Sequence, residues 1–229
     1  MRAKLYSKLE NCKVNDEVII DEDTHHLLNV VRVQVNDELL LLDGNGLKVH
    51  SKIVSLSKKQ VVARLDSIER SGRNNLSVAI GCPKRESFED CLKRCTELGV
   101  SHIIPLITKY SQLKNLNIER CQKILTSSLE QSNNSYMPKL LPLTDISKLE
   151  LGPYENKICL SMFSGTNKKI SYSEKNDLLL IGPEGGFDTD EEEELRSQEF
   201  QFLNFPTPIL KTSTAVCVAI AHRLSCSVY

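Results

Sequence analysis

The segment Gly182-Pro183-Glu184-Gly185-Gly186-Phe187 contains the residue types that most directly suggest a ligand site. Glycine has no side chain, so a ligand can approach the backbone N–H and C=O groups of such a segment closely. The segment matches neither the GxGxxG pattern of dinucleotide-binding loops nor the GK[ST] ending of a phosphate-binding loop. An ordinary turn between a strand and a helix is the alternative explanation. The glycine pattern alone leaves both interpretations open.

A second segment of unusual composition runs from Phe205 to Ala215. Two prolines and an apolar pair precede a stretch that is predicted to be helical, and Ser213 or Thr214 suits the N-cap position of that helix. A rigid entry into a helix is the simpler explanation. Ligands in open α/β sheets bind at the carboxyl ends of the strands. We therefore expect the site to form from the three loops that follow the predicted strands ending near Leu160, Ile181 and Phe205.

Strands and helices alternate after residue 75, and these elements must position both segments. Short runs rich in Val, Leu and Ile predict strands, and apolar residues at helical spacing predict helices. Such alternation is typical of a parallel sheet covered by helices. The predicted strands are Leu76–Ile80, His102–Ile107, Lys157–Met162, Asp177–Ile181 and Gln201–Phe205. The predicted helices are Ser87–Leu98, Ile118–Ser132, Asp190–Gln198 and Thr214–Cys226.

The helix predicted over Ser87–Leu98 has signals for both of its ends. Ser87 and Asp90 fit a capping box at the N-terminus. Gly99 suits the C′ position, where a residue with positive φ ends a helix. We therefore expect a helix of about this length between the first two strands of the alternating region.

The first 65 residues are predicted to form a small β domain of the barrel type. Asp43-Gly44-Asn45-Gly46 is a hairpin signal, since Asn and Gly tolerate the positive φ that a tight turn needs. The polar segment 66–75 is interpreted as a linker. The predicted strands of this domain are Val18–Ile20, Glu38–Leu42, Leu47–Val54 and Gln60–Leu65.

Charge and composition restrict the class of protein. The 29 Lys and Arg and the 30 Asp and Glu give a formal charge of −1, so any role with RNA or DNA must rely on a local basic patch. The longest aliphatic runs span only a few residues, whereas a transmembrane helix needs about 20. No apolar block follows the basic residues near the start, so we expect no signal peptide and a cytoplasmic protein.

The eight cysteines do not suggest a metal site. None forms a CxxC pair, and no cysteine lies near His25 and His26. Cys91 and Cys95 have helical spacing and are interpreted as small core residues. In a reducing compartment the cysteines are expected to remain thiols.

Several motifs occur in an order that resembles one known family. In sequence order they are Thr24–Arg32 (THHLLNVVR), Arg94–Val100 (RCTELGV) with Ile104-Pro105-Leu106 after it, Glu130-Gln131-Ser132 with Pro138 downstream, Ile181–Phe187 (IGPEGGF) and Ile209–Ala215 (ILKTSTA). With these motifs the chain resembles the 16S ribosomal RNA (uracil-N3) methyltransferase family of the SPOUT superfamily. The likeness covers nearly the whole chain, and ELGV and GPEGGF are its specific parts.

The resemblance implies a fold, a reaction and partners. The implied fold is α/β: a PUA-like β-barrel RNA-binding domain over residues 1–68, then a SPOUT parallel sheet with a C-terminal trefoil knot over residues 74–229. Members of the family are homodimers that bind S-adenosylmethionine in the knot. They methylate N3 of one uridine in 16S rRNA of the small ribosomal subunit. The implied chemistry requires neither a metal nor a membrane.

The resemblance also implies site residues. Lys211 and Ser213 occupy the positions expected to be catalytic. The expected RNA contacts are Arg32, Lys84, Arg85 and Arg94, although ordinary surface charge explains any one of them. The expected cofactor-binding residues lie at three strand ends and are Leu160, Ser161, Met162, Ile181, Gly182, Pro183, Glu184, Gly185, Gly186, Phe187, Ile209, Leu210, Thr212, Thr214 and Ala215.

The chain departs from the family pattern at several positions. Tyr110, Asn134, Pro208 and Lys211 replace arginines, and Ser213 replaces a glutamate. Lys211 retains the positive charge but lacks the planar fork of arginine. We therefore keep a second hypothesis, in which the chain is a catalytically altered or inactive RNA-binding relative that acts in ribosome assembly.

Overall fold

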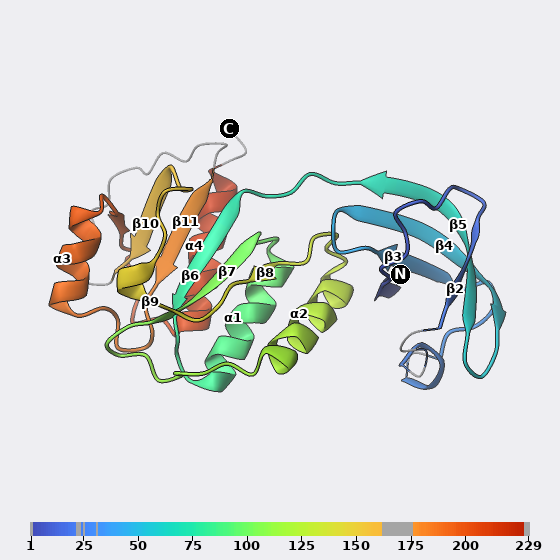
Figure 1. Ribbon diagram of the computed structural model, residues 1–229, viewed down its shortest axis with the longest axis horizontal. Helices are drawn as coiled ribbons and strands as arrows, with labels where there is room; N and C mark the ends of the chain where they lie inside the picture. Colours follow the sequence, from blue (N-terminus) through green and yellow to red (C-terminus); the bar gives the residue numbers. More distant parts are fainter. Residues whose placement is uncertain (1, 22–23, 25, 31, 162–175, 227–229) are drawn as a thin grey trace. The chain divides into compact units, whose positions relative to one another are not determined.

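The computed structural model describes residues 2–21, 24, 26–30, 32–161 and 176–226. The chain forms two compact units, each with its own sheet (Figure 1). The first unit comprises Met1–Arg73 together with Thr126–Met137. The second comprises Asn74–Leu125 together with Pro138–Tyr229.

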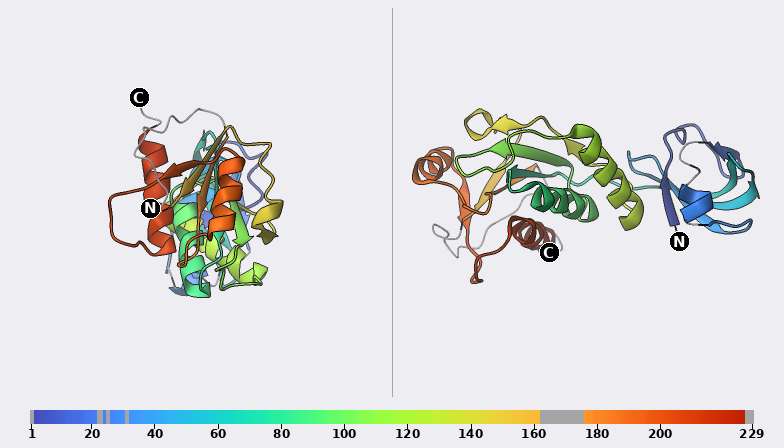
Figure 2. Two further views of the ribbon diagram at one scale, coloured as in Figure 1. Left: turned by 90° about the vertical axis from the view of Figure 1, so that its left-hand side faces the viewer. Right: turned by 90° about the horizontal axis from the view of Figure 1, so that it is seen from below.

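A five-stranded sheet in the order β1-β3-β4-β5-β2 forms the first unit and curls around an apolar core (Figure 2). Strand β1 pairs with β3 in parallel, and the other neighbours are antiparallel. The small β domain predicted from the sequence is confirmed. Its strands are β1 (Arg2–Leu5), β2 (Glu17–Ile20), β3 (Glu38–Leu42), β4 (Leu47–Leu56) and β5 (Val61–Arg70).

A seven-stranded sheet forms the centre of the second unit, in the order β12-β10-β11-β6-β7-β8, with β9 also paired to β7. Every strand pair is parallel, which confirms the predicted α/β architecture. The strands are β6 (Leu76–Gly81), β7 (His102–Ile107), β8 (Lys139–Leu140), β9 (Thr144–Asp145), β10 (Asn156–Leu160), β11 (Asp177–Ile181) and β12 (Gln201–Leu203).

Helices cover both faces of this parallel sheet. The helices are α1 (Arg85–Glu97), α2 (Ile118–Ser132), α3 (Thr189–Ser197) and α4 (Thr212–Ser225). Helices α1 and α4 pack side by side, and α4 also contacts β11 (Figure 2). On the other face, Leu195 of α3 packs with Leu178 and Leu180 of β11. None of the helices in the described part of the chain is long and apolar enough to cross a membrane.

Strand β3 is buried on both of its faces. Successive side chains of a strand point to opposite sides, so each face packs against its own partners. Leu39 and Leu41 belong to the core cluster of the curled sheet. Leu40 and Leu42 pack instead against Leu129, in the last turns of α2. The aliphatic run in this strand therefore reflects packing on two sides.

Glu130 attaches the end of α2 to the first unit. Its Oε1 accepts a hydrogen bond from the backbone N–H of Leu5 at 2.9 Å and lies 3.2 Å from Nζ of Lys4. The Lys4 side chain is almost fully buried, so this ion pair is shielded from water. The contribution of α2 to the first unit was not anticipated from the sequence.

Strand β5 extends further than the sequence predicts. Residues 66–70 of the predicted linker continue the strand, and Ile68 and Arg70 pair with Val49 and Leu47 of β4. Pairing satisfies the backbone N–H and C=O groups whatever the side chains are, so a strand can continue through polar, exposed residues. The linker prediction is therefore wrong for residues 66–70.

Helix α1 begins earlier than its predicted capping box. The backbone N–H of Phe88 donates to the carbonyl oxygen of Lys84 at 2.9 Å, and Lys84 is the N-cap, without a side-chain cap. Ser87 consequently lies inside the first turn, and the predicted box of Ser87 and Asp90 is wrong. The predicted end is confirmed, since Gly99 follows the C-cap with φ +73°.

The other two caps also differ from expectation. Helix α4 begins at Thr212 after Lys211, so Ser213 and Thr214 lie in its first turn and the predicted caps are wrong. A true capping box occurs at α3, where Asp188 accepts from the backbone N–H of Glu191 at 2.8 Å and Glu191 accepts from that of Asp188 at 3.0 Å. The box fixes the position at which the chain leaves the glycine-rich loop.

Candidate functional site

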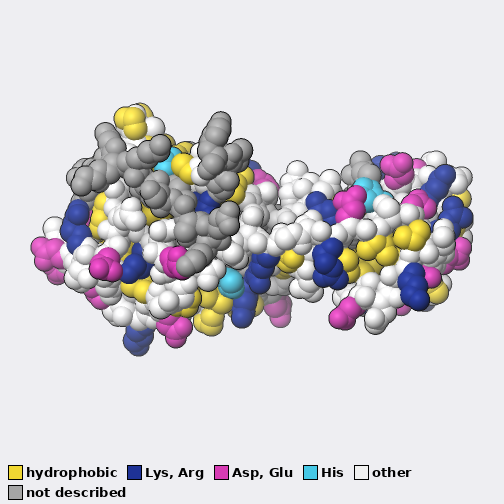
Figure 3. Space-filling model, turned by 90° about the horizontal axis from the view of Figure 1, so that it is seen from above, with side chains coloured by type: hydrophobic (Ala, Val, Ile, Leu, Met, Phe, Trp, Pro, Cys, Tyr) yellow, Lys and Arg dark blue, Asp and Glu magenta, His cyan; other side chains and the backbone are white. Residues whose placement is uncertain are grey.

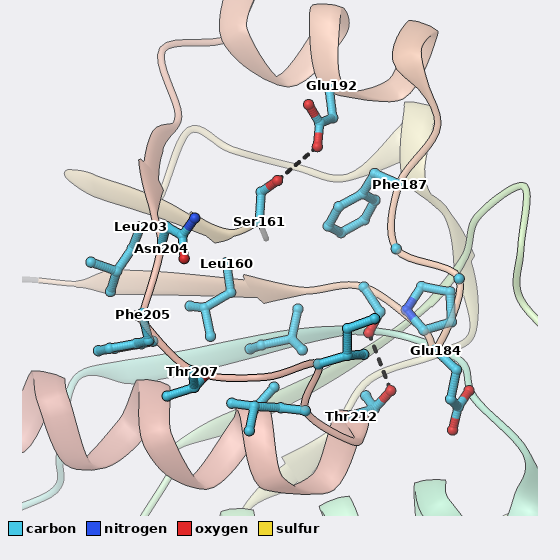
Figure 4. A pocket seen from close by; sticks show the side chains of 18 residues that line it. Leu160, Ser161, Glu184, Phe187, Glu192, Leu203, Asn204, Phe205, Thr207 and Thr212 are labelled. Carbon is cyan, nitrogen blue, oxygen red and sulfur yellow. Dashed lines mark hydrogen bonds between the residues drawn. The ribbon is translucent and has the colours of Figure 1, made fainter. Parts of the chain in front are cut away.

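A cavity of about 250 Å³ lies at the carboxyl ends of β10, β11 and β12 (Figure 4). Ligands of parallel sheets bind at this edge. Three segments that are distant in the sequence converge there. The lining residues are Leu160, Ser161, Ile181, Gly182, Pro183, Glu184, Gly185, Gly186, Phe187, Glu192, Leu203, Asn204, Phe205, Thr207, Ile209, Leu210, Thr212 and Ala215.

The cavity contains most of the residues that the sequence suggested for cofactor binding. Thr214 is the exception among the described ones, since it lines a separate hollow with Arg94 and Ser213. Met162 lies outside the described residues. The sequence reasoning missed Glu192, Leu203, Asn204, Phe205 and Thr207. Residues 203–205 lie at the carboxyl end of the predicted strand Gln201–Phe205, which is a signal for them, whereas no local pattern identifies Glu192.

The first wall of the cavity follows β10. Ser161 is almost fully buried, and its Oγ donates to Oε1 of Glu192 at 2.8 Å. The backbone N–H of Ser161 donates to the carbonyl oxygen of Leu203 at 3.2 Å. The end of β10 is therefore fixed between α3 on one side and β12 on the other (Figure 4).

The glycine-rich loop after β11 forms the second wall, and its glycines have different roles. A Cβ on Gly182 would lie 3.2 Å from backbone atoms of Gly186. A Cβ on Gly185 would lie 2.9 Å from Cβ of Tyr110. Gly186 has φ +71° and open space where a Cβ would be. Gly182 and Gly185 therefore allow the protein to pack on itself, and Gly186 is the position at which a ligand can approach the backbone.

The third wall runs from β12 into α4. The Thr212 hydroxyl donates to the carbonyl oxygen of Gly182 at 3.4 Å, which joins this wall to the second. The Ile209 side chain is 76% exposed beside the cavity. The ring of Phe205 meets His222 edge to face, with centroids 5.4 Å apart. An exposed aliphatic side chain at the edge of a cavity is favourably covered by a bound ligand.

The loop after β7 supports the glycine-rich loop from outside. Nζ of Lys109 lies 2.6 Å from Oδ2 of Asp188, and the backbone N–H of Lys109 donates to Oε1 of Glu191 at 2.7 Å. The hydrogen bond from Lys109 lowers the pKa of the Asp188 carboxyl and raises the pKa of the Lys109 ammonium. Tyr110 is thereby held against Gly185.

Among the residues that the structure describes, the charged side chains that line the cavity are both acidic. Glu184 is exposed at the rim, whereas Glu192 is held against Ser161 further inside (Figure 4). Four other described lining residues have polar, uncharged side chains, namely Ser161, Asn204, Thr207 and Thr212. The rest of the described lining residues are apolar or small. The site thus combines apolar walls with negative charge, which suits a ligand that is partly apolar and carries a positive charge.

The described residues show no cluster of His, Cys, Asp and Glu that could hold a metal ion. Burial raises the pKa of the Cys82 thiol to about 12, and it also raises the pKa of Cys91 and Cys95. A buried thiol with a raised pKa stays protonated and is a poor nucleophile. These cysteines act as core residues.

The two residues expected to be catalytic do not line the cavity. Lys211 is exposed immediately before α4. Ser213 lies in the hollow between α1 and α4. They flank Thr212, which does face the cavity. Lys211 and Ser213 are therefore sequence neighbours of a lining residue, but their own side chains do not line the cavity.

The four basic residues expected to contact RNA are all exposed. Lys84 and Arg85 lie at the start of α1, beyond the carboxyl end of β6. Arg94 lies on α1, 2.8 Å from Glu97, and Arg32 lies in the first unit with φ +55°. Basic and acidic side chains are mixed on the face shown in Figure 3. The structure therefore does not bring these four residues into one patch within a single unit.

Comparison with protein families identifies the class of the chain. Residues 70–223 match the model of an RNA methyltransferase domain, and residues 13–66 match that of an RNA methyltransferase PUA domain. The chain belongs to this RNA methyltransferase family. The range matched by the RNA methyltransferase domain includes every residue that lines the cavity, and the range matched by the PUA domain lies within the first unit.

Several relatives of this RNA methyltransferase are named ribosomal RNA small subunit methyltransferase E. The protein from Rickettsia conorii is 30% identical over 96% of this chain and 93% of its own length. The Bacillus subtilis protein is 27% identical over 89% of this chain and 87% of its own length. A crystal structure from Neisseria gonorrhoeae, bound to S-adenosyl methionine, has a TM-score of 0.85 and 25% identity, and covers 98% of this chain and 97% of its own.

Proposed function

We propose that this RNA methyltransferase transfers a methyl group from S-adenosylmethionine to N3 of a uridine in 16S rRNA of the small ribosomal subunit. The observation that carries the proposal is the cavity at the ends of β10, β11 and β12. Relatives named for small-subunit rRNA methylation and a similar structure bound to S-adenosyl methionine support it. The position N3 follows from the resemblance of the sequence motifs.

The residues of the cavity fit this cofactor. Apolar side chains such as Ile209 and Leu210 can cover an adenine ring, and the open space beside Gly186 lets a nucleoside approach the backbone. The acidic side chains Glu184 and Glu192 match a sulfonium cation. When bound, S-adenosylmethionine supplies an electrophilic methyl group whose leaving group is a neutral thioether.

The protein must place uracil N3 in line with that methyl group and favour loss of the weakly acidic N3–H proton. Positioning is the main source of rate acceleration in such a transfer. A cation near the developing uracil anion lowers the barrier further. We assign this role to Lys211, with Ser213 beside it, because both flank Thr212 of the cavity wall. Lys84, Arg85, Arg94 and Arg32 are proposed to hold the RNA.

Three further properties belong to the same proposal. The C-terminal end of the α/β domain is threaded as a trefoil knot of the SPOUT type. Two copies of the chain form a homodimer. The protein is located in the cytoplasm. Its domain of residues 1–68 holds the RNA, and its domain of residues 74–229 transfers the methyl group.

One observation favours a second candidate function. Lys211 and Ser213, which replace an arginine and a glutamate of the family pattern, lie outside the cavity. A protein that has lost methyl transfer can still bind RNA and act in ribosome assembly. The cavity itself is retained in this case, so cofactor binding alone does not separate the two functions.

The decisive test uses the purified full chain with small ribosomal subunits from a strain that lacks the modification. After incubation with S-adenosylmethionine, the rRNA is digested and its nucleosides are identified by mass spectrometry. We expect 3-methyluridine at one position. Cofactor binding by calorimetry without any methylated nucleoside would favour the inactive relative, and a methylated nucleoside of another kind would contradict the N3 assignment.

A further inference from the structure

Tyr110 is an exposed aromatic residue beside the glycine-rich loop. It is 45% exposed, and among the large hydrophobic residues that are exposed in the described part of the chain it is the aromatic one. Single exposed apolar side chains are common on protein surfaces, so exposure by itself indicates no function. What the ring can bind depends on how it is held and on which groups surround it.

A tight turn holds Tyr110 in place. The backbone N–H of Ser111 donates to the carbonyl oxygen of Thr108 at 3.1 Å, so Lys109 and Tyr110 are the two central residues of the turn. The buried hydroxyl of Ser111 accepts from the backbone N–H of Thr108 at 2.9 Å and donates to the carbonyl oxygen of Leu106 at 3.2 Å. A side chain on a fixed turn loses little conformational freedom when it binds a partner.

The loops after β6, β7 and β11 meet at the edge of the sheet that holds the cavity. A Cβ on Gly81, the last residue of β6, would lie 2.6 Å from Cδ of Pro183 and 3.2 Å from Cγ2 of Thr108. A Cβ on Gly185 would lie 3.1 Å from Cγ of Tyr110. Pro183 and Gly185 line the cavity, whereas Tyr110 does not. The ring of Tyr110 therefore packs against a cavity-lining loop from outside the cavity.

Two basic side chains follow β6 next to this turn. The backbone N–H of Gln112 donates to the carbonyl oxygen of Cys82 at 3.0 Å, which joins the chain after the turn to the chain before α1. Lys84 and Arg85 come directly after this point, and both are exposed. Proteins that bind single-stranded RNA combine aromatic rings, on which bases stack, with cations that contact the phosphates. The same combination is present here beside the cavity.

We propose that Tyr110 is a substrate-positioning residue that stacks on an unpaired base next to the target uridine, while Lys84 and Arg85 contact the adjoining phosphates. The proposal rests on the proposed function and adds a contact on the RNA side of the same site. N3 of uracil is a donor in base pairs, so the target must be unpaired before it can be methylated. The target base itself must approach the cofactor in the cavity, so a ring outside the cavity meets a neighbouring nucleotide.

The experiment measures binding of the full chain to small ribosomal subunits that lack the modification, over a range of salt concentrations. Binding of S-adenosylmethionine is measured in parallel by calorimetry. Tyr110→Phe keeps the aromatic face, whereas Tyr110→Leu keeps a bulky apolar side chain beside Gly185 without that face. Lys84→Met removes one proposed phosphate contact. The matched control is Ile118→Ala, which shortens another exposed apolar side chain of the same unit.

We expect Tyr110→Leu to weaken binding to the subunits by about tenfold and Tyr110→Phe to weaken it by less than about twofold. Neither variant should alter the salt dependence of binding, whereas Lys84→Met should lower its logarithmic slope by about one. Both variants of Tyr110, like Ile118→Ala, should leave the affinity for S-adenosylmethionine unchanged, and Ile118→Ala should also leave subunit binding unchanged.

Equal losses of subunit binding in Tyr110→Phe and Tyr110→Leu, or no loss in either, would overturn the inference. A loss of affinity for S-adenosylmethionine that parallels the loss of subunit binding would also overturn it, because the ring would then act only by holding the glycine-rich loop. If the unchanged protein and its variants bind the subunits as expected but no methylated nucleoside forms, the stacking role is supported and the proposed methyl transfer is contradicted.

Discussion

The hydroxyl of Thr212 donates a hydrogen bond to the carbonyl oxygen of Gly182 across 3.4 Å. This bond joins the first residue of α4 to the first residue after β11, so two walls of the cavity from distant parts of the sequence are held together. Thr212 is almost fully buried, so water does not replace the bond when it is lost.

Substitution Thr212→Val is expected to lower the free energy of unfolding by about 1 kcal/mol, because it leaves the Gly182 carbonyl without this donor. It should also weaken binding of S-adenosylmethionine, since the two walls separate more easily. Urea denaturation and calorimetry measure the two effects. Thr212→Ser retains the hydroxyl and serves as the control; a valine variant equal to this control in both measurements would show that the hydrogen bond is unimportant.

Gly185 is expected to tolerate no side chain because of Tyr110. Gly185→Ala places a Cβ 2.9 Å from Cβ of Tyr110, so the loop must shift and binding of S-adenosylmethionine should weaken. Combining it with Tyr110→Gly removes the clash and should restore part of the affinity in a double-mutant cycle. Additive losses in the cycle would show instead that the added methyl group meets the cofactor.

The ion pair of Lys109 and Asp188 predicts a pH-dependent contribution to stability. Lys109 lowers the pKa of the Asp188 carboxyl, so the pair stabilises the fold above the ordinary carboxyl pKa of about 3.9. That stabilisation is lost as the pH falls through the lowered pKa in the folded protein. Thermal unfolding between about pH 6 and pH 2 should therefore show a shallower acid decline in Asp188→Asn.

The asparagine variant isolates the charge, because its side-chain oxygen can still accept from the backbone N–H at the start of α3. Lys109→Met removes the other partner and should give a decline that is shallower than in the unchanged protein, but less so than in Asp188→Asn, because the backbone N–H of Glu191 still lowers the pKa of Asp188. If both variants followed the unchanged protein at every pH, the ion pair would have no role in its acid sensitivity.

Asp177 and Arg223 form an ion pair that attaches α4 to the start of β11. Asp177 is fully buried, and it also accepts a hydrogen bond from Nδ2 of Asn156 at 2.7 Å. Arg223→Leu should lower the free energy of unfolding by about 3–5 kcal/mol, because it leaves a buried carboxylate without its counterion. Adding Asp177→Asn removes that charge and should recover much of the loss in urea denaturation. No recovery would mean that the arginine acts through packing alone.

Lys211 is expected to affect the reaction more than the binding of the cofactor, because its side chain does not line the cavity. Lys211→Ala should reduce methyl transfer to small subunits by at least about tenfold and change the affinity for S-adenosylmethionine by less than about twofold. Lys211→Arg, which keeps the charge, is the control and should retain activity. Equal loss of rate and affinity in the alanine variant would contradict a role on the uracil side.

The sequence by itself determined the local features of this protein. The alternation of aliphatic runs with amphipathic stretches predicts the parallel sheet and its helices, because the periodicity of side chains depends only on the local backbone. The loops after β10, β11 and β12 could be predicted as the site because strand ends in a parallel sheet share one edge. Gly99 marks the end of α1, since its positive φ is a property of a single residue.

Only the tertiary structure decided which side chains meet. Thr212 and Thr214 lie two positions apart on α4, roughly 200° around the helix, and packing against α1 and β11 turns the first toward the cavity and the second away from it. Glu192 reaches Ser161 because α3 is held by the capping box of Asp188 and by Lys109. Such contacts depend on the order of strands and the rotation of helices, which long-range packing sets and no local pattern records.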